Sequence, residues 1–339
     1  MAPAGQSKAP TILDIATETG VSKSAVSRAL LGQGEVSQAT RDKVQLAATR
    51  LGYVANAMAR GLVSSKTKTL GVVLRDVTRP FYAELYAAMQ RRAEHAGYRI
   101  VTETSAGELD IADALSALRN LISLQVDGLI IASAQLSSDQ ITPFIDRVPM
   151  VVAGRKESNA SVSSVYCDDA DGGHRLADHL AEMGHRRVAV ALVDSSYSLS
   201  QHTRGTAMVE RLREHGIEAE VHEVEDDAAT RTIIGTVLEN EFVTALMCPT
   251  DAAVMDVLEA LRIRGRSAPT DLSVTGYDGL APLNAPFLGL TTFRQPVSDM
   301  GSRAVDLLLE TIEDRTASRR HIPLTGHLVP GRTSAPQRS

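Results

Sequence analysis

The chain has 339 residues, of which 43% are hydrophobic, and this length allows two or three domains with buried cores. No apolar run approaches the roughly 18 residues of a membrane helix, and the opening MAPAGQSKAP lacks the apolar core of a secretory signal, so we expect a cytoplasmic protein. Cys167 and Cys248 form no C-x-x-C pattern, which argues against a zinc site and against a disulfide scaffold.

The net charge of −6 is unevenly distributed along the chain. Residues 1–68 hold nine Lys and Arg against four Asp and Glu, whereas the remainder holds 26 against 37. A basic module on an acidic body suggests that only the first segment binds a polyanion. This is weak evidence by itself, because basic surface faces are common.

Three short helical patterns lie within the first 51 residues. The first begins after Thr11, a candidate N-cap, and is ended by Gly20. The second covers 23–30 after a possible cap at Ser22, and the third covers about 37–51. The sequence therefore predicts a compact three-helix headpiece over 10–55.

The spacing Ala16–Gly20–Val26 is typical of a helix-turn-helix unit. Such a unit needs a small residue at the helix crossing, a residue tolerant of positive φ in the turn, and an apolar residue facing back. The outer face of the second helix carries short polar or basic side chains that fit a major groove, namely Lys23, Ser24, Ser27 and Arg28. The alternative is a structural three-helix unit with a solvated face.

These residues resemble the headpiece of the LacI/GalR (lactose-repressor) family, without gaps, from TILDIATETG to MARGL. The resemblance implies base-reading roles for Lys23, Ser24 and Arg28. It implies phosphate contacts from the following residues: Thr11, Ser22, Ser27, Thr40, Tyr53 and Asn56.

The stretch 56–62 resembles the hinge helix of that family, within a hinge and linker over 56–68. The resemblance places Leu62 as a wedge that enters the minor groove and kinks the duplex. Gly61 lowers helix propensity by roughly 1 kcal/mol, which favours a hinge that folds on DNA. Val63 replaces a basic residue common in the family, and an ordinary linker helix is the alternative.

Strand and helix patterns alternate from Leu70 onward. Short apolar strands between helices of 12–15 residues indicate parallel sheets, and two such series predict two doubly wound lobes that bind ligand at the carboxyl ends of their strands. The helices of the pattern are predicted over the ranges 81–96, 109–124, 171–184, 202–215, 229–240 and 252–264.

The family resemblance extends over this part, through LGVVLRDVTRPFY, SVYCDDADGGHRLADHL, MGHRRVAV, DLSVTGYDG and LTTFRQP. It implies a periplasmic-binding-protein-like effector-binding and dimerisation domain over 69–332 whose chain crosses between lobes three times. The implied first lobe covers about 69–168 plus 297–327, and the second about 169–296. The expected fold class is thus an all-α headpiece with a hinge helix, joined to an α/β two-lobed domain with two doubly wound parallel sheets.

The resemblance also implies an effector site between the lobes. Phe81 and Tyr82 match aromatic residues that cover the ligand, Asp278 matches an acid that binds its polar groups, and Arg155 matches a position near the cleft. The sequence departs from the sugar-binding members at four positions. Arg79 and Thr250 replace Asn, Gly154 replaces Asp, and His202 replaces an Arg that grips the ligand; Arg79, His202 and Thr250 remain candidate contacts.

Sugar sites use bidentate charged groups to hold adjacent hydroxyls. The departures weaken that grip, and Arg79 and His202 would leave cationic donors facing Asp278. We therefore predict an anionic, phosphorylated or nucleoside-like effector, or a degenerate site. A sugar in another pose, the absence of any small ligand, and a purely structural His202 stay open.

The resemblance predicts a sequence-specific regulator, a repressor that binds a pseudo-palindromic DNA operator as a homodimer. The C-terminus, GRTSAPQRS, has no leucine heptads, so a tail-joined tetramer is not expected. An activator or dual regulator with a degenerate site is the alternative. The usual motifs for nucleotide binding, hydrolysis or metal ligation are absent from the sequence, so neither an enzyme nor a cofactor is expected.

Overall fold

A computed structural model describes residues 10–31, 34–54, 67–104, 110–133 and 136–337. The chain divides into two compact units, Met1–Thr67 and Lys68–Ser339, which are treated separately below. Asn56 and Leu62 of the predicted hinge lie outside the described residues.

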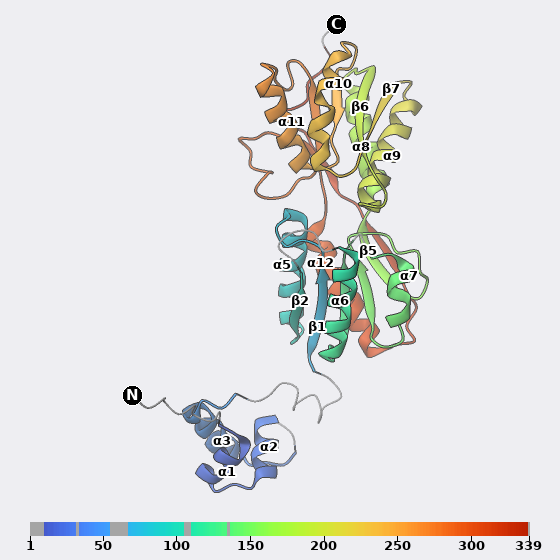
Figure 1. Cartoon of the computed structure of the whole chain (residues 1–339). Helices are drawn as coiled ribbons and strands as arrows, with labels where there is room; N and C mark the ends of the chain where they lie inside the picture. The colour runs from blue at the N-terminus through green and yellow to red at the C-terminus, as the bar shows by residue number, and fades with distance from the viewer. Residues whose placement is uncertain (1–9, 32–33, 55–66, 105–109, 134–135, 338–339) are drawn as a thin grey trace. The chain divides into compact units, whose positions relative to one another are not determined.

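The first unit contains the three predicted helices: α1 Ile12–Thr19, α2 Lys23–Leu31 and α3 Gln38–Leu51 (Figure 1). Gly20, at the end of α1, has φ of +65°, a conformation that a side chain disfavours. The Ser37 hydroxyl accepts a hydrogen bond from the Thr40 backbone N–H at 3.3 Å and caps α3. The turn and cap residues therefore determine where each helix starts and stops.

A small apolar core holds these helices together. Ile15 of α1, Val26 of α2 and Val44 of α3 are fully buried against one another, with Ala29 and Ala47 beside them. Each large side chain contributes roughly 1.5–3 kcal/mol through burial. Because α2 turns Val26 and Ala29 inward, its opposite face is left to solvent.

The second unit begins with a lobe built on a six-stranded sheet of order β11-β5-β4-β3-β1-β2, in which every recorded pairing is parallel. The edge strand β11, His321–Leu324, comes from near the end of the chain. Its first elements are β1 Thr69–Leu74, α5 Pro80–His95, β2 Arg99–Glu103, α6 Ile111–Ser123, β3 Gly128–Ala132, α7 Ser138–Ile141, η1 Thr142–Phe144, β4 Met150–Ala153 and β5 Ser163–Cys167. The strands β1, β3 and β4 are buried along their whole length, as expected for central parallel strands.

The other lobe is built on a six-stranded sheet of order β12-β10-β9-β8-β6-β7. Its elements are α8 Asp169–Glu182, β6 Arg187–Val193, α9 Leu199–Glu214, β7 Glu218–Val224, η2 Ala228–Ile233, α10 Ile234–Glu239, β8 Ala245–Met247, α11 Asp251–Ile263, β9 Ser273–Asp278, β10 Thr291–Arg294 and β12 His327–Val329. Only β12 pairs in the antiparallel sense among the recorded pairings. Two parallel-rich lobes after a helical headpiece confirm the predicted fold class.

The chain passes between the lobes at three places. After β5 it enters α8, after β10 it returns through α12 Val297–Glu313 and β11 His321–Leu324, and it then crosses again to β12 (Figure 1). Helix α12 packs beside α5 in the first lobe. The three crossings agree with the expected periplasmic-binding-protein-like connectivity.

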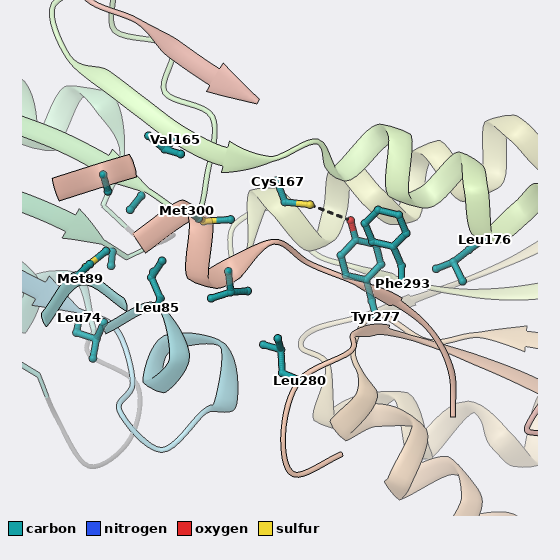
Figure 2. Packing of buried hydrophobic residues seen from close by; sticks show 14 of the residues in the cluster. Leu74, Leu85, Met89, Val165, Cys167, Leu176, Tyr277, Leu280, Phe293 and Met300 are labelled. Carbon is teal, nitrogen blue, oxygen red and sulfur yellow. Dashed lines mark hydrogen bonds between the residues drawn. The ribbon is translucent and has the colours of Figure 1, made fainter. Parts of the chain in front are cut away.

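Buried aromatic residues lie close to the first crossing. Tyr277 and Phe293 are stacked with ring centroids 5.0 Å apart, and the Cys167 sulfur lies 3.8 Å from the Tyr277 hydroxyl (Figure 2). Helices α8 and α9 cross at Gly173, where a Cβ would lie 2.5 Å from the Arg204 carbonyl oxygen. Close packing thus holds the first half of α9 against α8, the helix that follows the first crossing.

The predicted helix over 229–240 is only partly right. Residues Ala228–Ile233 form a 3-10 helix, and α10 follows it. The Thr232 hydroxyl donates to the Ala229 carbonyl oxygen at 2.7 Å, and such local bonds compete with regular helix formation. Within the described ranges, no helix is long and apolar enough to cross a membrane.

Candidate functional sites

The outer face of α2 carries the three candidate base-reading residues. Lys23, Ser24 and Arg28 are exposed, while Ser27 is half-buried at the edge of this face. All four lie on one short helix that the headpiece core holds rigidly from behind. A helix with this face fits the width of the major groove, where charged and hydroxyl side chains reach base edges.

The candidate phosphate contacts of the headpiece lie at helix ends. Thr11 and Ser22 are exposed beside the first turns of α1 and α2, while Thr40 and Tyr53 are half-buried at α3. Helix N-termini favour phosphate groups through free N–H donors. The Thr11 hydroxyl donates to the Asp14 carboxylate at 2.7 Å, so Thr11 would have to turn away from Asp14 to reach DNA.

A cavity of about 310 Å³ lies between the two lobes of the second unit, at the carboxyl ends of the strands. Ligand sites in proteins commonly start at about this size. Five of the candidate effector-binding residues line it: Arg79, Phe81, Tyr82, Thr250 and Asp278. The rest of its lining is Arg75, Thr78, Pro80, Gly154, Tyr197, Ser198, Ser200, Gln201, Arg204, Asp227, Ala228, Ala252, Ala253, Asp256 and Gln295.

Phe81 and Tyr82 form an apolar wall of the cleft. They follow Pro80 in the first turn of α5, and their rings meet edge to face with centroids 5.1 Å apart. Both pack against the central apolar core. This support fixes their orientation, so the cleft offers a rigid aromatic surface to a flat or ring-shaped ligand.

Asp278 lies at the floor of the cleft in a constrained conformation. Its φ of +116° is rare for a residue with a side chain. Its carboxylate accepts a hydrogen bond from the Gln295 amide at 2.7 Å and lies 3.6 Å from the Arg204 guanidinium. Burial raises the pKa of Asp278 to about 6, so a ligand that donates hydrogen bonds would stabilise its charged form.

Arg204 is a cleft residue that the sequence did not single out. Its guanidinium pairs with Asp169 at 2.9 Å, donates to the Pro249 carbonyl oxygen at 3.1 Å, and lies 3.7 Å from the Tyr277 ring centroid. It is almost completely buried. The available signal was its place directly before Gly205, at the start of the predicted helix.

His202 is not among the residues that line this cleft. Residues two positions apart on an α-helix point in directions about 200° apart. Because Arg204 faces the cleft, His202 therefore faces away from it. Its Nδ1 lies 2.8 Å from the Val193 carbonyl oxygen, and the side chain borders a separate cavity beside Asp194 and Glu223. The expectation of a cationic donor facing Asp278 is therefore not met at this position.

Arg155 is also absent from the cleft lining. It is buried behind Gly154, where its guanidinium donates to the Leu136 carbonyl oxygen at 2.6 Å and pairs with Glu157 at 2.9 Å. These contacts join the segment that follows β4 to Leu136, beyond the end of β3. Arg155 thus supports the loop that forms the cleft edge.

Asp251, beneath the cleft floor, makes the second unit sensitive to pH. Its carboxylate accepts a hydrogen bond from the Gly279 N–H at 2.8 Å, and burial together with the charge of Asp278 raises its pKa from 3.8 to about 7. The folded state therefore binds the proton more tightly than the unfolded state. Its contribution to stability falls as pH rises from about 4 to about 7 and is constant above that.

Asp251→Asn is expected to remove this pH dependence while keeping the acceptor for Gly279. Between pH 5 and pH 8 the unchanged chain should lose about 2 kcal/mol more unfolding free energy than the variant. Urea unfolding of both proteins at the two pH values measures the difference. Equal losses would show that Asp251 stays ionised in the folded state.

Comparison with known proteins assigns both units. Residues 11–56 match the family described as bacterial regulatory proteins, lacI family, and residues 67–330 match periplasmic binding proteins and sugar binding domain of LacI family. Catabolite control protein A of Priestia megaterium is 29% identical over 93% of this chain and 96% of its own length. The HTH-type transcriptional repressor PurR of Photobacterium profundum is 28% identical over 94% and 97%. The lac repressor dimer bound to operator and the anti-inducer ONPF matches with a TM-score of 0.84 and 25% identity, over 97% of this chain and 100% of that one.

Proposed function

The chain belongs to the LacI family of bacterial regulatory proteins, DNA-binding transcriptional regulators controlled by small molecules, and from this premise we propose that it is a cytoplasmic repressor. It binds a pseudo-palindromic operator as a homodimer, and an effector in the cleft controls that binding. One headpiece buries too little DNA surface for tight specific binding, which favours two copies on two half-sites.

The observation that carries this proposal is the exposed face of α2. Lys23, Ser24 and Arg28 project from a helix whose other side is locked by Val26 in the headpiece core. Long basic and short hydroxyl side chains are the groups that read guanine and adjacent bases in the major groove. The basic charge of residues 1–68 adds the attraction to phosphate that every specific complex needs.

Selection of DNA sites by the full-length chain tests the proposed function. A pool of random duplexes is bound to the purified protein, and the retained sequences are read after several rounds. We expect enrichment of one pseudo-palindrome with two half-sites. Retention without sequence enrichment, or enrichment of a single half-site bound by one copy, would contradict the proposal.

For the effector we propose a neutral molecule rich in hydrogen-bond donors, such as a sugar, a sugar derivative or a nucleoside, held by Phe81, Tyr82, Thr250 and Asp278. Of the effectors expected from the sequence, this proposal keeps the nucleoside-like class and the sugar alternative and gives up the anionic and phosphorylated ones. Arg79 and Arg204 already have carboxylate partners in Asp227 and Asp169, and His202 faces another cavity. The third arginine of the described cleft lining, Arg75, donates to the Tyr197 carbonyl oxygen and lies over its ring. An anion would therefore compete with existing partners of each arginine and would also meet the Asp278 and Asp256 carboxylates.

Asp278→Asn tests this assignment. With a panel of probes that includes D-glucose, D-ribose, adenosine and glucose 6-phosphate, calorimetry should detect binding of at least one neutral member and none of the sugar phosphate. The variant should weaken that binding about 10-fold to 100-fold, because a hydrogen bond to a charged acceptor is lost. Ser302→Ala, on α12 and outside the cleft lining, is the control. Tighter binding of the phosphate than of the neutral probes would overturn the proposed class.

A further inference from the structure

An ion pair joins the two lobes across the mouth of the cleft. Arg79, the residue before α5 in the first lobe, places Nη1 2.6 Å from the Asp227 carboxylate of the second lobe. Its Nη2 donates to the Tyr197 hydroxyl at 2.9 Å, also in the second lobe. One guanidinium therefore bridges the lobes with two hydrogen bonds, one of which is a charge-assisted bond to a carboxylate and so is stronger than a bond between neutral groups.

Tyr197 is held from a second direction by the first lobe. The Arg75 guanidinium, at the end of β1, lies 4.4 Å from the Tyr197 ring centroid and donates to the Tyr197 carbonyl oxygen at 2.9 Å. The Tyr197 backbone N–H donates to the Asp194 carbonyl oxygen at 3.2 Å, which fixes the turn before α9. The turn of one lobe thus lies between two arginines of the other.

Asp227 is held in place by its own lobe and is kept ionised chiefly by Arg79 of the other lobe. Its carboxylate accepts hydrogen bonds from the Thr250 hydroxyl at 3.1 Å and from the Tyr197 hydroxyl at 3.2 Å, and its side chain is only 3% exposed. Burial alone would raise the pKa of Asp227, but the hydrogen bond and charge of Arg79, with those of Thr250 and Tyr197, lower it below the usual value. The pair is therefore fully charged at neutral pH.

We propose that Arg79, Asp227 and Tyr197 form a latch by which the chain closes its two lobes on each other without an effector. The cavity of about 310 Å³ exists with the latch formed, so a small ligand fits behind it. This inference rests on the effector role proposed above for the cleft. Arg79 is then a positioning residue, which holds the two lobes in the closed arrangement and does not itself bind the effector. It raises the population of the closed form that the effector binds, and apparent affinity rises with that population.

Pulsed electron paramagnetic resonance on the full-length chain tests the latch directly. Spin labels are attached at Ser116→Cys on α6 of the first lobe and Thr236→Cys on α10 of the second, both exposed sites. The native Cys167 and Cys248 are buried and, through burial, have raised pKa values, so the introduced thiols react selectively. The distance distribution then reports the ratio of closed to open lobes with no ligand and no DNA added.

Arg79→Ala and Asp227→Ala are each expected to lower the closed-to-open ratio about 10-fold or more, since a charge-assisted bond is lost. The double variant should be no more open than Arg79→Ala, because that substitution already removes the contact with Asp227. The matched control is Arg92→Ala, on the helix α5 that Arg79 precedes, whose partner Asp306 at 2.6 Å belongs to the same lobe. It should leave the ratio unchanged.

Asp227→Asn keeps the test decisive if an alanine variant does not fold, because it preserves shape and removes only the charge. A folded Asp227→Asn chain, verified by circular dichroism, whose distances equal those of Arg92→Ala would overturn the latch. This outcome is independent of DNA recognition. If the chain selects an operator but Asp227→Asn leaves the lobe distances unchanged, the proposed function stands and the latch is wrong. If Asp227→Asn opens the lobes but the chain selects no operator, the latch stands and the proposed function is wrong.

Discussion

Arg204→Met is expected to lower the unfolding free energy of the second unit by about 3–5 kcal/mol, the usual cost of removing one partner from a buried ion pair. Asp169 would be left buried without its guanidinium partner. An unpaired buried carboxylate is costly, so in the folded state Asp169 would have to take up a proton. Methionine fills much of the same volume, so the loss reports the charge and not a cavity. Urea unfolding at pH 7, followed by circular dichroism, measures it.

A second substitution and a control identify the cause of that loss. Asp169→Asn combined with Arg204→Met should recover much of the stability, because no unpaired charge then remains buried. Arg211→Met lies on the same helix α9 and removes an ion pair with Asp178 that is about one-third exposed. It should have a far smaller effect. Equal losses at positions 204 and 211 would show that burial of the Arg204 pair has no energetic consequence.

Arg28→Ala is expected to weaken binding to the selected operator by about 1–3 kcal/mol, or roughly 5-fold to 150-fold, and to relax base choice at one position of each half-site. The reason is that a guanidinium can donate two hydrogen bonds to guanine, and alanine donates none. Fluorescence anisotropy with the operator and its single-base variants, at a fixed salt concentration, measures both effects.

The control for Arg28 is Arg50→Ala on α3 of the same headpiece. Arg50 forms an ion pair with Glu18 of α1 and lies outside the candidate base-reading face. Its loss should leave base preference unchanged. If Arg28→Ala weakens binding equally on every sequence and reduces the dependence on salt, Arg28 contacts phosphate and the base-reading assignment is wrong.

Local patterns were sufficient to predict most elements of this protein. The helix caps and turns around Gly20, Ser37 and Gly52 place the headpiece helices to within a residue or two. The alternation of apolar strands and helices predicts the two lobes, and β1 begins at Thr69, one residue before the predicted start of the pattern at Leu70. Such features depend on neighbours in the sequence, so periodicity and turn chemistry reveal them.

Contacts between segments far apart in the sequence determine which side chains line the cleft, and these could not be predicted from local patterns. Position 202 was expected to face the ligand, but the packing of α9 against α8 turns Arg204 inward and His202 outward. Asp227 did not stand out in the sequence, since it is one of three successive acids in Glu225-Asp226-Asp227. Only its distance from Arg79, 148 residues away, distinguishes it.

The class of protein, the order of its elements and the candidate base-reading face of α2 could therefore be inferred from the sequence, because each depends on a continuous stretch of residues. The tertiary structure decided which charges of the cleft are already paired and which remain for a ligand. Charge pairing depends on distances of a few ångströms between separate elements, and no spacing along the chain encodes those distances.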